Sequence, residues 1–430
     1  KIACVGDIMC GDSFYALGRG VASALDRHGK DFLPDSIVDV LFGHDLVLCN
    51  IECVLSNVGR KEYSLRSLHM RGRPQAAEYL AQWGITVAHV ANNHILEQGV
   101  EAAVDTVRQL QSAGIKTVGA GENGRFQSGI GVVDVTLGDQ LVTVIGACFH
   151  TGKYAFSSKL NEVLELIRAE ASKENLVIVS VHWGDELIDR PSIWQRQVTR
   201  EFISAGASLI IGHHPHVIQG VDNSDSALTA YSLGNFIFDG YLEATGWSVI
   251  LSITMSEKKV SKWEAIPVLR GEDHRPALAR GERKDELQKE ILRRCNLSRQ
   301  EIVDTEKYEE EYISDLFAED EYTANREVLC QWEEKISQAS DILICVSRRL
   351  YEEKASQRDN VFYLPHGVDF EFFHEVANNG NNSIKELADV PRPIVGYYGT
   401  LTSHNDVELL RYCAMHLRDI SFVLAGQITG

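Results

Sequence analysis

The chain has 430 residues, of which 44% are hydrophobic and 24% charged, a composition that excludes disordered, collagen-like and fibrous proteins. Asp and Glu outnumber Lys and Arg by 61 to 42, which gives a formal net charge of −19. This charge argues against a protein that binds nucleic acid or an anionic membrane, because both partners are polyanions and need a basic surface. The length suggests about three domains of roughly 150 residues each.

Residues 1–268 alternate short apolar runs with amphipathic stretches, a pattern typical of an α/β domain. Five runs are predicted to form buried strands: Ile2–Val5, Leu46–Cys49, Val87–Ala91, Val177–Val181 and Leu209–Ile211. Four stretches with apolar residues at helical spacing are predicted to form helices: Pro74–Trp83, Val100–Ala113, Leu160–Ala171 and Ile193–Ala205. A hairpin is expected within Gly129–Cys148 and three strands without a helix within Leu228–Val268, so we expect mixed rather than purely parallel pairing.

The character of the chain changes at about Arg270, where charge becomes dense and apolar residues thin out. This pattern favours a solvated helical linker. Strand-like runs then return at Ile342–Val346, Val361–Leu364, Ile394–Tyr398 and Phe422–Ala425. We therefore predict a first domain at 1–270, a charged helical linker at 271–331 and a partial domain at 332–430. No apolar run approaches the roughly 20 residues that a membrane-spanning helix needs.

Polar side chains follow the predicted strands at the edge where open α/β sheets hold ligands. In strand order they are Asp7; Asn50 and Glu52; Asn92, Asn93 and His94; His182; and His213, His214 and His216. Each of these alone has an ordinary explanation as a helix cap, a turn residue or a buried histidine. Five strand ends with such groups are hard to explain by packing, because buried Asp, Glu and His need partners. The pattern therefore predicts a metal site.

The predicted metal ligands combine two carboxylates, one amide oxygen and three imidazoles: Asp7, Glu52, Asn93, His182, His214 and His216. No thiolate is among them, which disfavours a soft metal. Six ligands exceed the needs of one catalytic zinc and suit two divalent ions about 3.5–4 Å apart with a bridging carboxylate. The identity of the ions (Mn, Zn, Fe or Mg) stays open. His94 remains outside the ligand set, and we predict that it protonates the leaving group.

Taken together, these motifs resemble the calcineurin-like metallophosphoesterase superfamily, and more closely its capsule, or poly-γ-glutamate, synthesis branch, the CapA family. The motifs are Gly6-Asp7-Ile8-Met9, Asn50-Ile51-Glu52, Asn92-Asn93-His94, His182-Trp183-Gly184-Asp185-Glu186, and segments 212–219 and 231–238. The resemblance covers about 1–268 and implies a four-layer α/β/β/α sandwich with metals at the strand ends. Four further residues are expected to line the pocket: Asn50, Asn92, His213 and Asn235.

Two residues depart from the pattern of the wider superfamily. Met9 stands where the Gly-Asp-x-His motif has its histidine, and Glu52 stands where the bridging aspartate is usual. Both departures are typical of the CapA branch, and they imply a weaker first metal site. For this branch the resemblance implies a role in making or anchoring an anionic capsule polymer, while the bond that is cleaved stays open.

The region after about Trp332 resembles part of a family 4-type glycosyltransferase with a GT-B fold. The motifs are Ala339-Ser340-Asp341, Leu364-Pro365-His366-Gly367-Val368-Asp369 and Gly396-Tyr397-Tyr398-Gly399-Thr400-Leu401. The resemblance implies that Gly399 and Thr400 lie near the phosphates of a nucleotide sugar, and a small-residue turn before a helix suits phosphate. A plain βαβ unit is the alternative. Most of the acceptor domain and the distal acidic pair are missing, so we predict that this chain alone does not transfer sugar.

The leading hypothesis is a two-metal, phosphoesterase-type hydrolase fused to a glycosyltransferase fragment, acting in capsule, poly-γ-glutamate or exopolysaccharide assembly. The alternatives are a metal-dependent module that holds an anionic polymer with little turnover, and a glycosyltransferase that uses a nucleotide sugar. Expected partners are an anionic polymer or phosphoester and other capsule-synthesis proteins. Location stays open: the acidic charge and nine cysteines without a disulfide pattern favour the cytoplasm, whereas a signal or anchor removed before Lys1 would favour the cell surface.

Overall fold

The computed structural model describes residues 1–61, 67–120, 129–150, 157–223, 226–240 and 244–299, and short segments at 343–345, 355–356, 361–363, 394–398 and 421–425. The chain divides near Glu319 into two units, and each is described by itself. Among the described residues, every helix is too short or too polar to cross a bilayer. Six cysteines of the first unit are buried free thiols.

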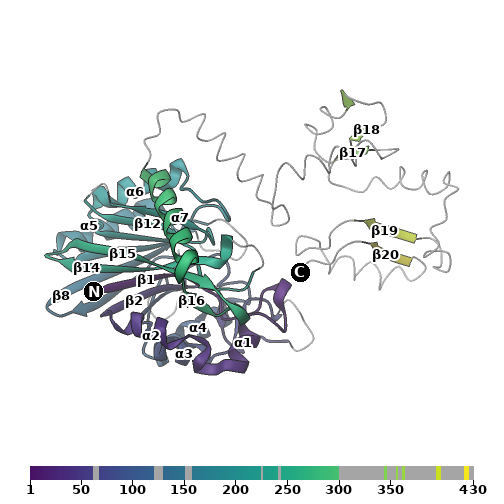
Figure 1. The fold of residues 1–430 in the computed structure, drawn as a ribbon, viewed down its shortest axis with the longest axis horizontal. Helices are drawn as coiled ribbons and strands as arrows, with labels where there is room; N and C mark the ends of the chain where they lie inside the picture. Colours follow the sequence, from purple (N-terminus) through teal and green to yellow (C-terminus); the bar gives the residue numbers. More distant parts are fainter. Residues whose placement is uncertain are drawn as a thin grey trace. The chain divides into compact units, whose positions relative to one another are not determined.

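Two β-sheets form the centre of the first unit (Figure 1). The first sheet has the order β16-β15-β14-β1-β2-β5-β6, and β13 pairs with β1. Its strands are β1 (Ile2–Ile8), β2 (Leu46–Ile51), β5 (Val87–His89), β6 (Lys116–Val118), β13 (Asn235–Ile237), β14 (Trp247–Ser256), β15 (Lys259–Arg270) and β16 (Pro276–Leu278). The pairs among β1, β2, β5 and β6 are parallel, whereas β14, β15 and β16 extend the sheet by antiparallel pairing.

The second sheet has the order β11-β12-β10-β9-β8-β7. Its strands are β7 (Gly131–Leu137), β8 (Gln140–Cys148), β9 (Leu176–His182), β10 (Leu209–His213), β11 (Ile218–Asp222) and β12 (Leu228–Leu233). The four inner strands are parallel, and the two outer ones, β7 and β11, are antiparallel to their neighbours. A separate short pair joins β3 (Val54–Leu55) to β4 (Arg71–Gly72). The predicted mixed pairing is therefore confirmed for this unit.

Helices cover the outer face of each sheet (Figure 1). The first sheet packs against α1 (Val21–His28), α2 (Asp35–Phe42), α3 (Ala76–Gln82) and α4 (Val100–Ser112). The second sheet packs against α5 (Leu160–Ser172) and α6 (Ile193–Ala205). Short 3-10 helices lie at Phe14–Ala16, Gly29–Phe32, Ala244–Gly246 and Glu272–His274. The helix α6 begins with a complete capping box, in which Ser192 and Gln195 bond each other's backbone N–H groups.

The core lies in three layers because side chains alternate along each strand. In β1, Ala3 and Val5 face the helices of the first sheet, whereas Ile2 and Cys4 face the second sheet. Each fully buried aliphatic side chain of this kind contributes about 1.5–3 kcal/mol. The result is a sequence of helices, sheet, sheet and helices. The predicted hairpin within Gly129–Cys148 is β7 and β8, and Leu228–Val268 contains four strands instead of the three expected.

Residues 276–299, which the sequence places in a charged linker, belong to the first unit. The strand β16 pairs with β15, and α7 (Gly281–Arg299) packs against β11. Three side chains one turn apart, Leu287, Ile291 and Cys295, are buried in the core between the sheets. A helix is present here as predicted, but it packs against the second sheet instead of lying in solvent. It does so because a narrow apolar stripe runs along its otherwise charged surface.

The described part of the second unit consists of two parallel strand pairs. The strand β17 (Leu343–Cys345) pairs with β18 (Val361–Tyr363), and β19 (Ile394–Tyr398) pairs with β20 (Ser421–Ala425). These strands match the four runs that the sequence predicts. Gly399 and Thr400, predicted to lie near a nucleotide sugar, fall outside the described residues, so their role stays a prediction.

Candidate metal centre

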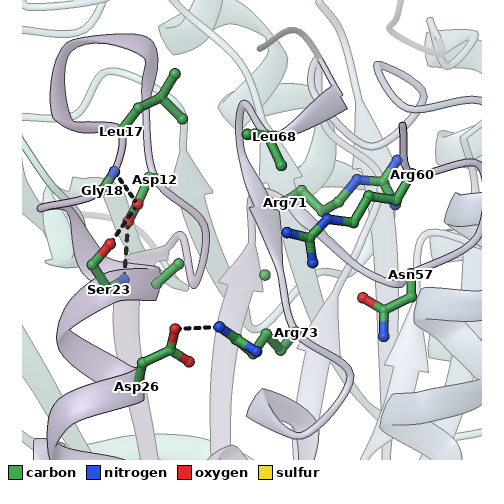
Figure 2. Close-up of a pocket in the computed structure, with 12 residues that line it drawn as sticks. Asp12, Leu17, Gly18, Ser23, Asp26, Asn57, Arg60, Leu68, Arg71 and Arg73 are labelled. Atoms are coloured by element: carbon green, nitrogen blue, oxygen red, sulfur yellow. Dashed lines mark hydrogen bonds and ion pairs between the residues drawn. The ribbon is translucent and has the colours of Figure 1, made fainter. Parts of the chain in front are cut away.

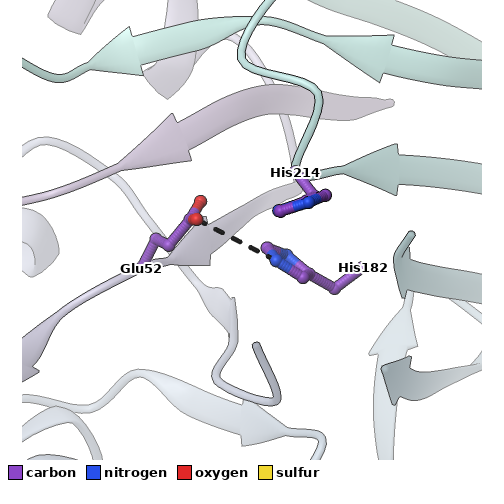
Figure 3. A group of neighbouring side chains, drawn as sticks. All are labelled: Glu52, His182 and His214. Atoms are coloured by element: carbon purple, nitrogen blue, oxygen red, sulfur yellow. Dashed lines mark ion pairs between the residues drawn. The ribbon is translucent and has the colours of Figure 1, made fainter. Parts of the chain in front are cut away.

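Acidic and histidine side chains from both sheets meet around Glu52, which follows β2 and is fully buried (Figure 3). Its Oε1 atom lies 3.5 Å from Nε2 of His216 and 3.9 Å from Nε2 of His182. The same oxygen lies 3.9 Å from Nε2 of His94. These separations exceed a hydrogen bond and leave Oε1 without a hydrogen-bond partner. A carboxylate oxygen in this position is suited to bind a cation.

Glu52 belongs to two groups of potential metal ligands at once. Glu52, His182 and His214 form one group, and Asp7, Glu52 and His216 form the other, with the ligand atoms of each group within 4.8 Å of one another. Asn93 extends the first group, because its Oδ1 lies 2.8 Å from Nε2 of His182. The structure thus brings together all six residues that the sequence predicts as ligands, and it makes Glu52 the residue that the two groups share.

The electrostatics of these groups fit the binding of divalent cations. Burial raises the pKa of Glu52 well above the ordinary glutamate value and lowers the pKa values of His182 and His214 well below the ordinary histidine value. Neutral imidazoles are the form that binds metals. Nδ1 of His214 and Oε1 of Glu52 are both buried without a hydrogen-bond partner, which native proteins rarely tolerate unless an ion or water completes the site.

The loop after β10 carries two of the candidate ligands in strained backbone conformations. His214 has φ of 101° and His216 has φ of 59°, on either side of Pro215. Such conformations cost about 1–3 kcal/mol each in residues with a Cβ atom and cluster at functional sites. The backbone N–H of His214 donates to Oδ2 of Asp7 at 3.3 Å, which ties the loop to β1.

Two residues beside the candidate ligands hold Asp7 and His216 in place. Nδ1 of His213 lies 3.3 Å from Oδ1 of Asp7. Burial opposes ionisation of Asp7, yet the neighbouring His213 holds the pKa of this carboxyl below its ordinary range. Asn235 Oδ1 lies 2.9 Å from Nδ1 of His216 and fixes the ring so that Nε2 faces Glu52. Both residues were predicted to line the pocket, and both are buried behind the ligands.

The other two predicted lining residues, Asn50 and Asn92, are also buried. Nδ2 of Asn50 donates to Oδ1 of Asp7 at 2.9 Å and to Oε2 of Glu52 at 3.2 Å, so it links the two carboxylates. Nδ2 of Asn92 donates to the carbonyl of Ile51 at 2.7 Å, which connects the end of β5 to the end of β2. Both asparagines therefore position the ligands.

His94, the predicted proton donor, lies at the rim of the group with 23% of its side chain exposed. Its Nδ1 atom lies 3.1 Å from Oε2 of Glu97, and its Nε2 atom faces Glu52. Oε1 of Glu97 lies 3.6 Å from Nε2 of His69. Sequence reasoning missed His69 and Glu97. Glu97 stands three residues after His94, within reach on one turn, whereas nothing in the sequence points to His69.

Two more residues near the cluster were not predicted. The ring of His150 lies 4.6 Å from the ring of His214, and its Nδ1 atom is buried without a hydrogen-bond partner. The exposed Glu186 forms a further potential ligand group with His214 and His216. His150 follows the end of β8 by two residues, so the strand-end rule that found the other histidines could have found this one.

Comparison with known proteins identifies relatives of the first unit. Residues 1–240 match the family described as bacterial capsule synthesis protein PGA_cap. The chain is 30% identical over 278 residues to a capsule biosynthesis protein CapA from Bacillus anthracis, covering 61% of this chain and 66% of the relative. It is 28% identical over 298 residues to a PGA biosynthesis protein CapA from Bacillus subtilis (strain 168), covering 67% and 76%.

Solved structures give weaker matches. A novel phosphatase from Mycoplasma pneumoniae matches with a TM-score of 0.41 and 14% identity, over 62% of this chain and 92% of that one. A putative 5′-nucleotidase from Staphylococcus aureus matches with a TM-score of 0.39 and 15% identity, over 68% of this chain and 58% of that one.

Proposed function

We propose a function from one premise: the chain belongs to the bacterial capsule synthesis protein family PGA_cap. The proposed activity is that of a metal-dependent hydrolase of the phosphoesterase type, with two divalent cations. We place this activity in the assembly of a capsule, poly-γ-glutamate or exopolysaccharide, because the relatives named above are capsule and PGA biosynthesis proteins. The substrate would be an anionic polymer or a phosphoester.

The observation that carries the proposal is the double role of Glu52. One buried carboxylate takes part in two ligand groups, and the other members of these groups come from different strands of both sheets. A shared carboxylate is the arrangement that holds two cations close enough to act on one substrate. A histidine cluster that only stabilised the fold would pair its ring nitrogens with hydrogen-bond partners instead.

In the proposed site, Asp7, Glu52 and His216 would hold one cation. Glu52 would also hold the other, together with three side chains: Asn93, His182 and His214. When bound, the two cations supply Lewis acidity, which lowers the pKa of water and offsets negative charge on the oxygens of a phosphoester. Asn50 keeps the two carboxylates at a fixed spacing through its hydrogen bonds to both.

His94 is proposed to protonate the leaving oxygen. Its Nε2 atom points toward the shared carboxylate, and its partial exposure lets a substrate reach it. The contact between Nδ1 and Glu97 fixes the orientation of the ring. A positioned acid of this kind contributes about 10²–10⁴-fold to the rate.

The experiment that tests this function is hydrolysis of bis(p-nitrophenyl) phosphate after chelation and reloading with Mn²⁺, Zn²⁺, Fe²⁺ or Mg²⁺. We expect about two ions per chain by elemental analysis and turnover that depends on them. His94→Asn is expected to keep the ions and lose most of the turnover, whereas the matched surface variant His28→Asn keeps both. Turnover that is equal with and without metal would refute the proposal.

One observation favours a second candidate, a module that holds an anionic polymer with little turnover. The group Asp7, Glu52 and His216 offers three ligands, and the neighbouring Met9 is a buried thioether, which is a poor ligand for hard cations. A weakly held cation would support binding better than catalysis. Two ions per chain without turnover of any phosphodiester would decide for this candidate.

Sugar transfer by the second unit is a separate proposal that rests on the sequence resemblance around Gly399 and Thr400. Its test is an assay with a panel of nucleotide sugars and the full chain. We expect no transfer by this chain alone, and robust transfer would overturn that expectation.

A further inference from the structure

A cavity that the proposed hydrolysis does not use contains three arginines in a strongly acidic protein. It has a volume of about 200 Å³ and lies between α1, the loop after β1, the loop after β3 and the strand β4 (Figure 2). The charged residues of its lining are Asp12, Asp26, Arg60, Arg71 and Arg73. A basic cavity stands out against a net charge of −19 and calls for an explanation.

The two acidic residues of this arginine pocket are already engaged. Oδ2 of Asp12 accepts hydrogen bonds from the backbone N–H of Gly18 at 2.9 Å and from the hydroxyl of Ser23 at 2.8 Å. Asp26 forms an ion pair with Arg73. Within the described part of the chain, no carboxylate pairs with Arg60 or Arg71. Among the described residues, the guanidinium groups of Arg60 and Arg71 therefore form no ion pair, and the five charged side chains of the lining carry a net positive charge.

Arg71 is a fixed donor in the wall. It is 7% exposed, and its guanidinium donates to the carbonyls of Ser56 at 2.7 Å, Val58 at 2.9 Å and Ser67 at 2.6 Å. A fourth N–H reaches Oε1 of Gln98 at 3.2 Å. Because a guanidinium has five N–H donors, one remains for a ligand. Neutral partners hold the side chain rigid without cancelling its charge.

Arg60 is the adaptable donor. It makes no side-chain hydrogen bond or ion pair among the described residues, and Figure 2 shows its side chain directed into the cavity. Burial, and then the nearby charge of Arg60, lower the pKa of Arg71. Two neighbouring guanidinium groups repel each other, and an anion bound between them offsets this repulsion. Planar arginine forks bind carboxylates and phosphates through paired hydrogen bonds.

The arginine pocket adjoins the proposed hydrolytic site through one short segment. His69, which contacts Glu97 beside His94, stands two residues before Arg71. Gln98 bonds both ends of this segment, the carbonyl of His69 at 2.9 Å and the guanidinium of Arg71. A polymer lying across His94 would therefore extend toward the arginines.

We propose that the arginine pocket of Arg60, Arg71 and Arg73 binds an oxyanion of the substrate, a carboxylate or a phosphate, on a unit next to the one at the cations. This inference rests on the proposed function for the identity of the ligand as substrate, but the pocket itself is defined independently of the cations. It gives the enzyme a preference for long anionic chains over small esters.

The test uses the metal-loaded full chain and isothermal titration with two probes, a synthetic γ-linked glutamate hexamer and inorganic phosphate. Arg60→Gln is the variant, since the Arg60 side chain makes no hydrogen bond or ion pair with the described residues. Arg283→Gln, which changes an exposed arginine of α7, is the matched control. We expect Arg60→Gln to weaken binding of one probe about tenfold, and the wild-type affinity for that probe to fall with salt. The probe that is affected identifies the oxyanion as carboxylate or phosphate.

Equal affinities of wild type and Arg60→Gln for both probes would overturn the pocket, as would an equal loss in Arg283→Gln. Hydrolysis of bis(p-nitrophenyl) phosphate separates this failure from that of the proposed function, because the diester carries one oxyanion and has no second unit to place in the arginine pocket. We expect Arg60→Gln to keep wild-type turnover of this ester. If the wild type does not hydrolyse this ester, the proposed hydrolase function fails, and the titration then tests the arginine pocket by itself.

Discussion

Replacement of Glu52 by Gln tests whether one carboxylate serves two cations. Gln keeps the shape of the side chain and removes the charge that faces three imidazoles at 3.5–3.9 Å. Since Glu52 belongs to both ligand groups, we expect both ions to be lost together. Replacement of His216 should leave in place the ion bound by the group Glu52, His182 and His214, because His216 is not a member of that group.

The size of the effect follows from linkage between metal binding and folding. An ion present at a hundredfold excess over its Kd stabilises the folded protein by about 2.7 kcal/mol. With an unfolding entropy of roughly 2.1 cal/mol/K per residue, a unit of about 300 residues gains about 4 °C in Tm for each ion. Wild type should therefore gain about 9 °C from two ions, and Glu52→Gln close to none.

The assay is calorimetry of chelated and Mn²⁺-loaded protein together with elemental analysis. Without metal, we expect Glu52→Gln to be at least as stable as wild type, because it removes a buried carboxylate whose Oε1 has no hydrogen-bond partner. The exposed Glu286→Gln is the control and should behave as wild type. A Glu52→Gln protein that retains two ions and the full gain in Tm would refute the shared carboxylate.

Three further changes have defined outcomes. His94→Asn should reduce phosphodiester turnover by about 10²–10⁴-fold at constant metal content, and unchanged kinetics would exclude it as the proton donor. Ile291→Ala should lower the free energy of unfolding in urea by about 2–5 kcal/mol, and an unchanged midpoint would mean that α7 is not part of the cooperative unit. Hydrogen bonds from Arg293 and Arg294 lower the pKa of Glu290 from 4.5 to about 2, so its carboxylate stabilises the folded protein above pH 4.5 and this contribution disappears as the pH falls to about 2. Glu290→Gln should therefore reduce the loss of stability over this interval by about 1 kcal/mol after solvent screening, measured by tryptophan fluorescence, and an identical acid slope would contradict this.

The sequence reveals the strand-end cluster because its residues interrupt apolar runs at one position in each strand. The buried strands β1 and β9 carry Asp7 and His182 at their carboxyl ends, where the apolar run stops. Parallel pairing brings such strand ends to one edge of the sheet. The same regularity predicts the strands and four of the helices. These features depend on local pattern, so a single sequence contains them.

Features that depend on tertiary contact are not visible in the same way. The helix α7 is mostly charged, and its stripe of Leu287, Ile291 and Cys295 is too narrow to distinguish docking from solvation without the partner surface. His69 lies beside Glu97 because tertiary contacts, such as the hydrogen bond from Gln98 to the carbonyl of His69, bring two loops together. The arginine pocket arises in the same way, because its lining residues at 12–26 and those at 57–60 and 68–73 are 31 positions apart at their nearest.

The candidate ligands are divided between the two sheets, with Asp7 and Glu52 on one and His182 on the other. Bound cations would therefore join the two layers at one edge, in addition to the apolar packing between the sheets. Slippage of one layer past the other by a single residue, about 3.3 Å, would exceed any metal–ligand bond length and empty the site. Removal of the cations by a chelator should therefore lower hydrogen-exchange protection first in β1 and β9, because these strands carry the candidate ligands Asp7 and His182. The helical layers should respond later.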